Sequence, residues 1–149
     1  MECFKTFRKA PPSQLIMTLL VKNEESMLEE NLLFHKAMGV DSFIITDNNS
    51  TDSTPEIIRK YKQKGWIKEV IEEKATDYEQ KEWVDRMIWK AKTIYKADWI
   101  INADADELWY SPSGNLKTDL SATHANVLNC EMRSVYPEEN RPFWQWIKL

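Results

Sequence analysis

Apolar segments of strand length alternate with amphipathic segments of helix length, and this alternation constrains the fold more than any other feature of the chain. The strand-like segments share a mostly apolar composition; they are Leu15–Val21, Ser42–Thr46, Trp66–Ile71 and Trp99–Ile101. The first is almost continuously apolar, as expected of a strand buried on both faces of a parallel sheet. Parallel strands in sequence need a crossover connection, usually a helix. We therefore predict an α/β fold, with a mainly parallel sheet and helices on both faces.

The connections between these segments carry helix signals. Ser26 and Glu29 have the spacing of a capping box, and Gly39 is placed to end the helix that would follow. Thr54–Pro55 predicts the N-cap and the first residue of a second helix. Apolar residues at helical spacing predict a third helix between the third and fourth strands.

One domain is expected over residues 15–149, preceded by a leader over residues 1–14. The leader mixes charges with two prolines and has no hydrophobic period. A chain of 149 residues can close one core but is short for two ordinary domains. We predict one more strand over residues 126–135. The aromatic residues within 143–147 would either cap the core or form an oligomer contact.

Charge and hydropathy weigh against several classes of partner. The formal net charge of −4 gives no global attraction to nucleic acid or to anionic lipid. No apolar run approaches the roughly 20 residues that cross a bilayer, and the first residues do not lead into the apolar segment of a secretory signal. We therefore expect a cytoplasmic protein with no nucleic-acid partner and no transmembrane segment. Cys3 and Cys130 are far apart in the chain, which favours two reduced thiols over a zinc or redox site.

Phosphate binding in this chain could not depend on a glycine-rich loop. The three glycines, Gly39, Gly65 and Gly114, cannot form a P-loop or a dinucleotide fingerprint. The fourth strand, however, leads directly into Asp104, Asp106 and Glu107. Two aspartates at positions i and i+2, where a strand gives way to a loop, can turn toward one divalent cation such as Mg²⁺ or Mn²⁺. The alternative is an ordinary turn, because turns favour aspartate and the chain has 24 acidic residues.

Polar residues follow three of the four predicted strands. Asn23 and Glu24 follow the first strand, Asp47 ends the second, and Asp104 follows the fourth. Open α/β sheets bind ligands beyond the carboxyl ends of their strands, where the strand order reverses. If the fourth strand lies beside the first, Asn23 faces Asp104 across that point. The segment that begins at Asp47 also fits an Asx-rich turn.

Three segments resemble, in order and spacing, the nucleotide-binding half of glycosyltransferase family 2-like proteins with the GT-A fold. They are Leu19–Glu24, Ile44–Thr54 and Asp98–Leu108. His35 also fits the branch of that group that carries an Asp-Ala-Asp-Glu motif. The resemblance implies a Rossmann-like nucleotide-binding half. It also implies transfer of a sugar from a nucleotide-sugar donor, commonly a UDP-sugar, to a hydroxyl of a carbohydrate or glycan acceptor, with inversion.

The resemblance implies roles for individual residues. Asp106 would bind Mn²⁺ or Mg²⁺ that bridges the diphosphate, and Asp104 would reach the ribose, or the metal through water. Three residues would line the base and ribose pocket: Asn23, Glu24 and Asp47. Arg86 would help near the phosphates, although a solvated helix face is the more common role for such a residue. Glu107 is better explained as a structural carboxylate.

The general base is not identified. Inverting members of the resembling group take it from sequence well beyond the Asp-x-Asp motif, and the acids in that part of this chain fall in no recognised motif: Asp119, Glu131, Glu138 and Glu139. Two hypotheses stay open, a glycosyltransferase and a truncated, non-catalytic module that binds a nucleotide or a partner protein. A nucleotidyltransferase is a weaker third, because such enzymes use a glycine-rich basic loop.

Overall fold

The computed structural model describes residues 13–73, 80–123, 125–128, 130–132 and 134. The strands of this part of the chain are β1 (Leu15–Val21), β2 (Ser42–Asp47), β3 (Ile67–Glu72) and β4 (Trp99–Ala103). Its helices are α1 (Leu28–Ala37), α2 (Thr54–Gln63), α3 (Gln80–Thr93) and α4 (Leu116–Ser121). Strands and helices alternate along the chain, which confirms the predicted α/β class.

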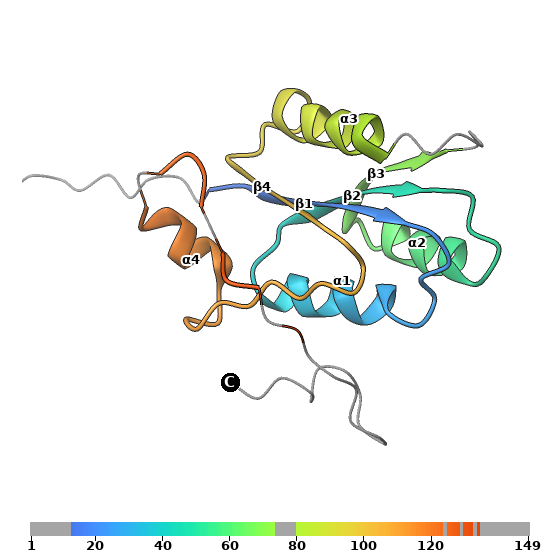
Figure 1. Cartoon of the computed structure of the whole chain (residues 1–149), viewed down its shortest axis with the longest axis horizontal. Helices are drawn as coiled ribbons and strands as arrows, with labels where there is room; N and C mark the ends of the chain where they lie inside the picture. Colours follow the sequence, from blue (N-terminus) through green and yellow to red (C-terminus); the bar gives the residue numbers. More distant parts are fainter. Residues whose placement is uncertain (1–12, 74–79, 124, 129, 133, 135–149) are drawn as a thin grey trace, which may run out of the picture.

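The strands form one parallel sheet in the order β3-β2-β1-β4. The strands β2 and β3 follow one another on one side of β1, and β4 lies on the other side of β1. The predicted neighbourhood of the first and fourth strands is therefore confirmed. In the register, Val21 pairs with Asp47 and Leu19 pairs with Ala103, so the loops after these three strands leave the sheet at one edge (Figure 1).

Helices cover both faces of the sheet, as predicted (Figure 1). Side chains alternate between the faces of a strand, and the core divides accordingly. Alternate residues of β1, from Leu15 to Val21, are buried with residues of α1 and α2. Ile16 packs on the opposite face with Met87 and Ala91 of α3. The sheet is therefore a central layer, with α1 and α2 on one face and α3 on the other.

Two predicted helix starts are wrong in detail. The N-cap of α1 is Met27 and not Ser26, and no side chain caps this end. The Met27 N–H instead donates to the backbone oxygen of Glu24 at 3.1 Å. Thr54 is the first residue of α2 and not its N-cap, because its hydroxyl accepts a hydrogen bond from the Glu24 N–H at 2.8 Å. A local backbone contact with Glu24 forms the start of α1, whereas Thr54 at the start of α2 contacts a residue 30 positions away.

The last predicted strand is wrong where the structure describes it. Residues 126–128, 130–132 and 134 form no strand, and Val127 and Met132 are each 85% exposed. A strand is stable only when a neighbour pairs with it and its apolar face is covered. The leader (except residues 13 and 14) and the aromatic residues of 143–147 lie outside the described residues. Within the described part of the chain, no helix has both the length and the apolar character needed to span a membrane.

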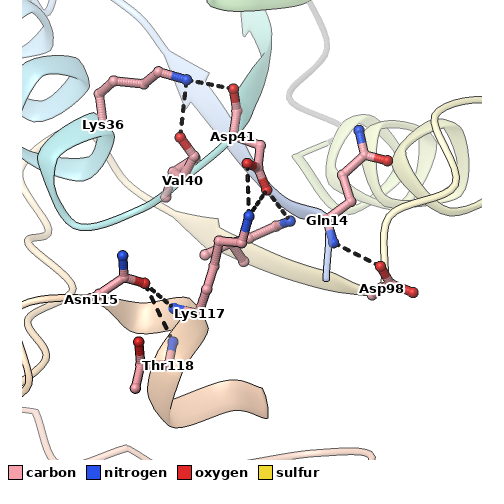
Figure 2. A network of polar contacts seen from close by, with 9 residues as sticks. Gln14, Lys36, Val40, Asp41, Asp98, Asn115, Lys117 and Thr118 are labelled. Atoms are coloured by element: carbon pink, nitrogen blue, oxygen red, sulfur yellow. Dashed lines mark hydrogen bonds and ion pairs between the residues drawn. The ribbon is translucent and has the colours of Figure 1, made fainter. Parts of the chain in front are cut away.

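The short helix α4 was not predicted, and polar contacts fix it near the amino edge of the sheet, as Figure 2 shows. The Asn115 side chain caps it by accepting hydrogen bonds from two backbone N–H groups. Asp41 accepts hydrogen bonds from the Lys117 ammonium at 2.9 and 3.0 Å and from the Leu15 N–H at 2.8 Å. The Leu116 N–H donates to the backbone oxygen of Met38 at 2.8 Å. The helix α4 therefore lies opposite the edge where the predicted site residues follow their strands.

Candidate functional site

The loops that follow β1 and β2 are joined by reciprocal hydrogen bonds. The Asn23 side-chain oxygen accepts from the Thr51 N–H at 2.8 Å, and the Asn23 N–H donates to the Ser50 hydroxyl at 2.9 Å. The Glu25 N–H donates to Asp52 at 3.1 Å. Asn23 has a φ of +57°, a left-handed conformation that asparagine tolerates better than most residues. The oxygen of this predicted nucleotide-binding residue thus holds the neighbouring loop.

Asp47 ends β2 and is buried. Its Oδ1 accepts a hydrogen bond from the Ser50 N–H at 3.0 Å, within the Asx-rich turn that the sequence offered as an alternative. Because β1 lies between β2 and β4, and neighbouring strands are about 4.8 Å apart, Asp47 is roughly 10 Å from the residues after β4. This spacing suits contacts of Asp47 and those residues with two parts of one extended ligand.

The segment after β4 forms a turn, and we name residues 104–109 the acidic loop. Buried and exposed residues alternate here. Ala103 and Ala105 are buried in the core with α1, whereas Asp104 and Asp106 are exposed. The Glu107 N–H donates to the Asp104 backbone oxygen at 3.1 Å, and the Glu107 carboxylate accepts from the Asp104 N–H at 3.3 Å. Glu107 thus binds the backbone of its own loop, while the two aspartates extend into solvent.

Glu24 lies near both exposed aspartates. Burial raises the pKa of its carboxyl group, and the negative charges of Asp106, Asp104 and Asp52 raise it further. A like charge raises the pKa of an acid only when it is close. Glu24 follows β1, and Asp104 and Asp106 follow β4, so all three residues lie at the carboxyl end of the junction of β1 and β4, where the strand order reverses. A bound cation would offset this concentration of negative charge.

The donor atoms at this junction suit a hard divalent cation. Carboxylate oxygens are the ligands that Mg²⁺ and Mn²⁺ prefer, and Mg²⁺ commonly keeps water and substrate phosphate in its coordination shell. Among the described residues, no three acidic, histidine or cysteine side chains are already arranged around a common metal position. Asp104 and Asp106 fit a site that is completed by phosphate and water and not a closed cage of side chains.

Arg86 is not brought to the acidic loop. This residue of α3 forms an ion pair with Glu73, which follows β3. The strands β3 and β4 are the two edges of the sheet, three strand spacings or about 14 Å apart. The placement favours the solvated helix face over the predicted role near the phosphates.

Asp119 lies at the opposite edge of the sheet from Asp104 and Asp106. It belongs to α4, near the amino edge of the sheet, and its carboxylate accepts a hydrogen bond from the Ser111 hydroxyl. Glu131 is exposed and belongs to no helix or strand, and Glu138 and Glu139 lie outside the described residues. The structure therefore assigns no general base.

Two residues contact the acidic loop from its buried side, and the sequence had not predicted either contact, although His35 was part of the family resemblance. Asn31 and His35 lie on α1, four residues apart, and both are 0% exposed. Asn31 donates hydrogen bonds to backbone oxygens of the loop, and His35 accepts one from a backbone N–H. Buried polar side chains nearly always have partners. Asn31 and His35 are four residues apart, on the same helix face as the apolar Leu28 and Leu32. This pattern was the sequence signal for a polar contact on the buried side of the helix.

The comparison with protein families decides the class. Residues 17–140 match the sequence model of Glycosyltransferase family 92, a range that includes all three motif segments. The chain belongs to glycosyltransferase family 92. The predicted glycosyltransferase class is thus confirmed, and the family is 92, where the motifs had indicated the broader group of family 2-like proteins. A search of curated proteins found no match to this family 92 chain.

Solved structures share the fold of this family 92 chain. A mannosyltransferase from Pyrobaculum calidifontis, PcManGT, solved in complex with GDP-Man and Mn²⁺, matches with a TM-score of 0.51 and 18% identity over 68% of this chain and 30% of its own. TarS from S. aureus matches with a TM-score of 0.52 and 17% identity over 73% of this chain and 19% of its own. These likenesses show the GT-A-like fold. The chain spans less than a third of either protein.

Proposed function

We propose that this family 92 chain binds a nucleotide-sugar donor at the carboxyl edge of the sheet, between β1 and β4. The observation that carries the proposal is the acidic loop, which presents Asp104 and Asp106 to solvent beside Glu24 at the strand reversal. Open α/β sheets bind ligands at that position. Membership of a glycosyltransferase family supports a sugar donor. A UDP-sugar is the donor class tested first, with GDP as the comparison nucleotide.

Asp104 and Asp106 would hold Mn²⁺ or Mg²⁺, which when bound stabilises the charge of the departing nucleoside diphosphate as a Lewis acid. Asp106 is the direct ligand of this proposal, and Asp104 reaches the ribose, or the cation through water. The diphosphate needs such compensation because the chain has no glycine-rich phosphate loop. The complex of PcManGT with GDP-Man and Mn²⁺, on a similar fold, supports this assignment.

Glu24 and Asp47 would orient the nucleoside. The roughly 10 Å between the end of β2 and the end of β4 suits a ligand with its nucleoside near Asp47 and its diphosphate near the acidic loop. Asp47 uses Oδ1 in its turn, and a carboxylate has further lone pairs for ribose hydroxyls or base N–H groups. Asn23 would contribute by holding the loop after β2 in place through Thr51.

The reaction of the proposal is a displacement at the anomeric carbon. The acceptor hydroxyl oxygen forms the new bond, the bond to the diphosphate oxygen breaks, and the hydroxyl proton passes to a base. A single displacement of this kind inverts the anomeric centre. The acceptor is a carbohydrate or glycan hydroxyl in this proposal.

The first experiment is a titration of the chain with Mn²⁺ in the presence and absence of UDP or GDP, followed by melting temperature. A ligand that binds only the native state raises apparent stability. We expect a rise that needs both metal and nucleotide and that is lost in Asp106→Asn. The matched control is Asp85→Asn, which removes an exposed carboxylate from α3 and should behave as wild type. Absence of any nucleotide effect at millimolar concentration, with metal present, refutes the proposal.

A second measurement separates a transferase from a non-catalytic binding module. Incubation with UDP-sugars and Mn²⁺ should release UDP by transfer or by slow hydrolysis, and the release should be lost in Asp106→Asn. Binding without any release in a panel of donors would favour the module.

A further inference from the structure

Two side chains on the buried side of α1, Asn31 and His35, hold the backbone of the acidic loop. The Asn31 side-chain nitrogen donates to the backbone oxygens of Ala105 and Glu107, each at 2.9 Å. The His35 Nε2 accepts from the backbone N–H of Trp109 at 3.0 Å. These bonds lie on both sides of the second aspartate of the loop.

The partners of His35 determine its tautomer. A backbone N–H can only donate, so Nε2 must be the unprotonated acceptor toward Trp109. The proton is then on Nδ1, which donates to Asn31, whose backbone oxygen and side-chain oxygen are both 2.9 Å away. The Asn31 amide is oriented in turn, because the reverse orientation would place its oxygen against two carbonyl oxygens. Burial lowers the pKa of His35 to about 4, which agrees with a neutral ring.

The acidic loop needs such support because it carries like charges. Asp104 and Asp106 are exposed on one turn, and Glu24 adds a third carboxylate close to them. Mutual repulsion favours conformations in which these groups move apart. The backbone bonds to α1, together with the buried methyl group of Ala105, oppose that movement. All three bonds are made to the backbone, so the side chains of both aspartates stay available.

We propose that Asn31 and His35 are positioning residues of the cation and diphosphate site. They hold the backbone of residues 105–109 so that the carboxylates of Asp104 and Asp106 are already in place before a ligand binds. The proposal rests on the proposed function of the acidic loop. A preorganised site loses less conformational freedom on binding and so binds more tightly.

The test compares two variants of one residue by Mn²⁺ binding. In His35→Gln, an amide oxygen can accept from the Trp109 N–H while the amide nitrogen donates to Asn31. In His35→Leu, the side chain fills the space but leaves that N–H without an acceptor. Removal of a group that orients a metal ligand typically costs 10- to 100-fold in metal affinity. We expect a loss of about tenfold or more in His35→Leu and recovery of most of it in His35→Gln, measured by the electron paramagnetic resonance signal of free Mn²⁺ with and without UDP.

Leu32→Ala is the matched control for lost stability. Leu32 is also fully buried on α1, within the apolar core. This variant should lose stability while its Mn²⁺ affinity stays within about twofold of wild type, measured at a temperature where all variants are folded. A fall in affinity equal to that of His35→Leu would overturn the proposal, because lost stability alone would then explain the effect.

Hydrogen exchange of wild type tests the same proposal if His35→Leu does not fold. The Trp109 amide should be protected from exchange in the absence of Mn²⁺, since its bond to His35 precedes ligand binding. Exchange that slows only after Mn²⁺ and UDP are added would overturn the proposal.

The two proposals fail in different ways. If Asp106→Asn loses Mn²⁺ binding but His35→Leu and Asn31→Ala do not, the positioning role is wrong and the proposed function stands. If the wild-type chain binds Mn²⁺ neither alone nor with UDP, the proposed function fails, and the positioning role fails with it.

Discussion

Acidification from pH 7 to pH 5 should destabilise the chain through His35. The ring is 0% exposed, and burial lowers its pKa from 6.5 to about 4, although its bond to the Asn31 backbone partly opposes the shift. Below pH 6.5, His35 therefore binds a proton in the unfolded chain, whereas in the folded chain it stays neutral until the pH is about 4. The contribution of His35 to the free energy of unfolding is therefore fully present above pH 6.5 and is lost as the pH falls toward 4.

The magnitude follows from the two pKa values. The difference between 6.5 and about 4, at about 1.36 kcal/mol for each pH unit, amounts to roughly 3 kcal/mol once the pH is below both values. By pH 5 about 2 kcal/mol of this should already be lost. Domains of this kind have total stabilities of about 5–15 kcal/mol, so the loss is large enough to measure.

The assay is urea unfolding of wild type and His35→Gln, followed by tryptophan fluorescence at pH 7, 6 and 5. Glutamine does not titrate, and the acidic groups common to both proteins cancel in the comparison. The difference in free energy of unfolding between the two proteins should therefore change by about 2 kcal/mol in favour of the variant between pH 7 and pH 5. A difference that stays constant across this range would refute the reasoning, because His35 would then not be a buried neutral ring.

Two further predictions concern stability near α4. Gly39→Ala should cost about 2 kcal/mol or more, because Gly39 has a φ of +96° and a Cβ there would lie 2.7 Å from the Asn115 Oδ1. Gly65→Ala, at a φ of +75° with no atom within 4 Å of the added Cβ, should cost less in the same urea assay, and equal losses would show that the contact is unimportant. Asn115→Ala should cost about 1 kcal/mol through the lost cap of α4, and an unchanged unfolding midpoint would contradict that.

The fold was predictable because it depends on local hydrophobic patterns. The continuous apolar run of β1 and the spacing of the segments after it were enough to indicate a parallel sheet with crossover helices. The two boundary errors have different causes, the first local and the second non-local. Ser26 has the spacing of a cap, but Glu24 supplies the backbone oxygen that the first turn of α1 uses, and Thr54 binds Glu24 from 30 residues away.

The acidic part of the candidate site was also predictable, because Asp104 and Asp106 directly follow a strand. The contacts of the other predicted residues were not predictable, since each depends on a partner distant in sequence or on an unexpected turn. Arg86 pairs with Glu73, and the Asn23 oxygen binds Thr51. The partners of Asn31 and His35 lie more than 70 residues away, and only the packing of α1 under the acidic loop brings them together.

The most direct test of the account is a crystal structure of the chain with Mn²⁺ and UDP in which the anomalous signal locates the metal. We expect a manganese peak within coordination distance of Asp106, on the side that faces Glu24, with the diphosphate beside it. A manganese ion bound elsewhere on the chain, with Asp104 and Asp106 still turned to solvent, would contradict it.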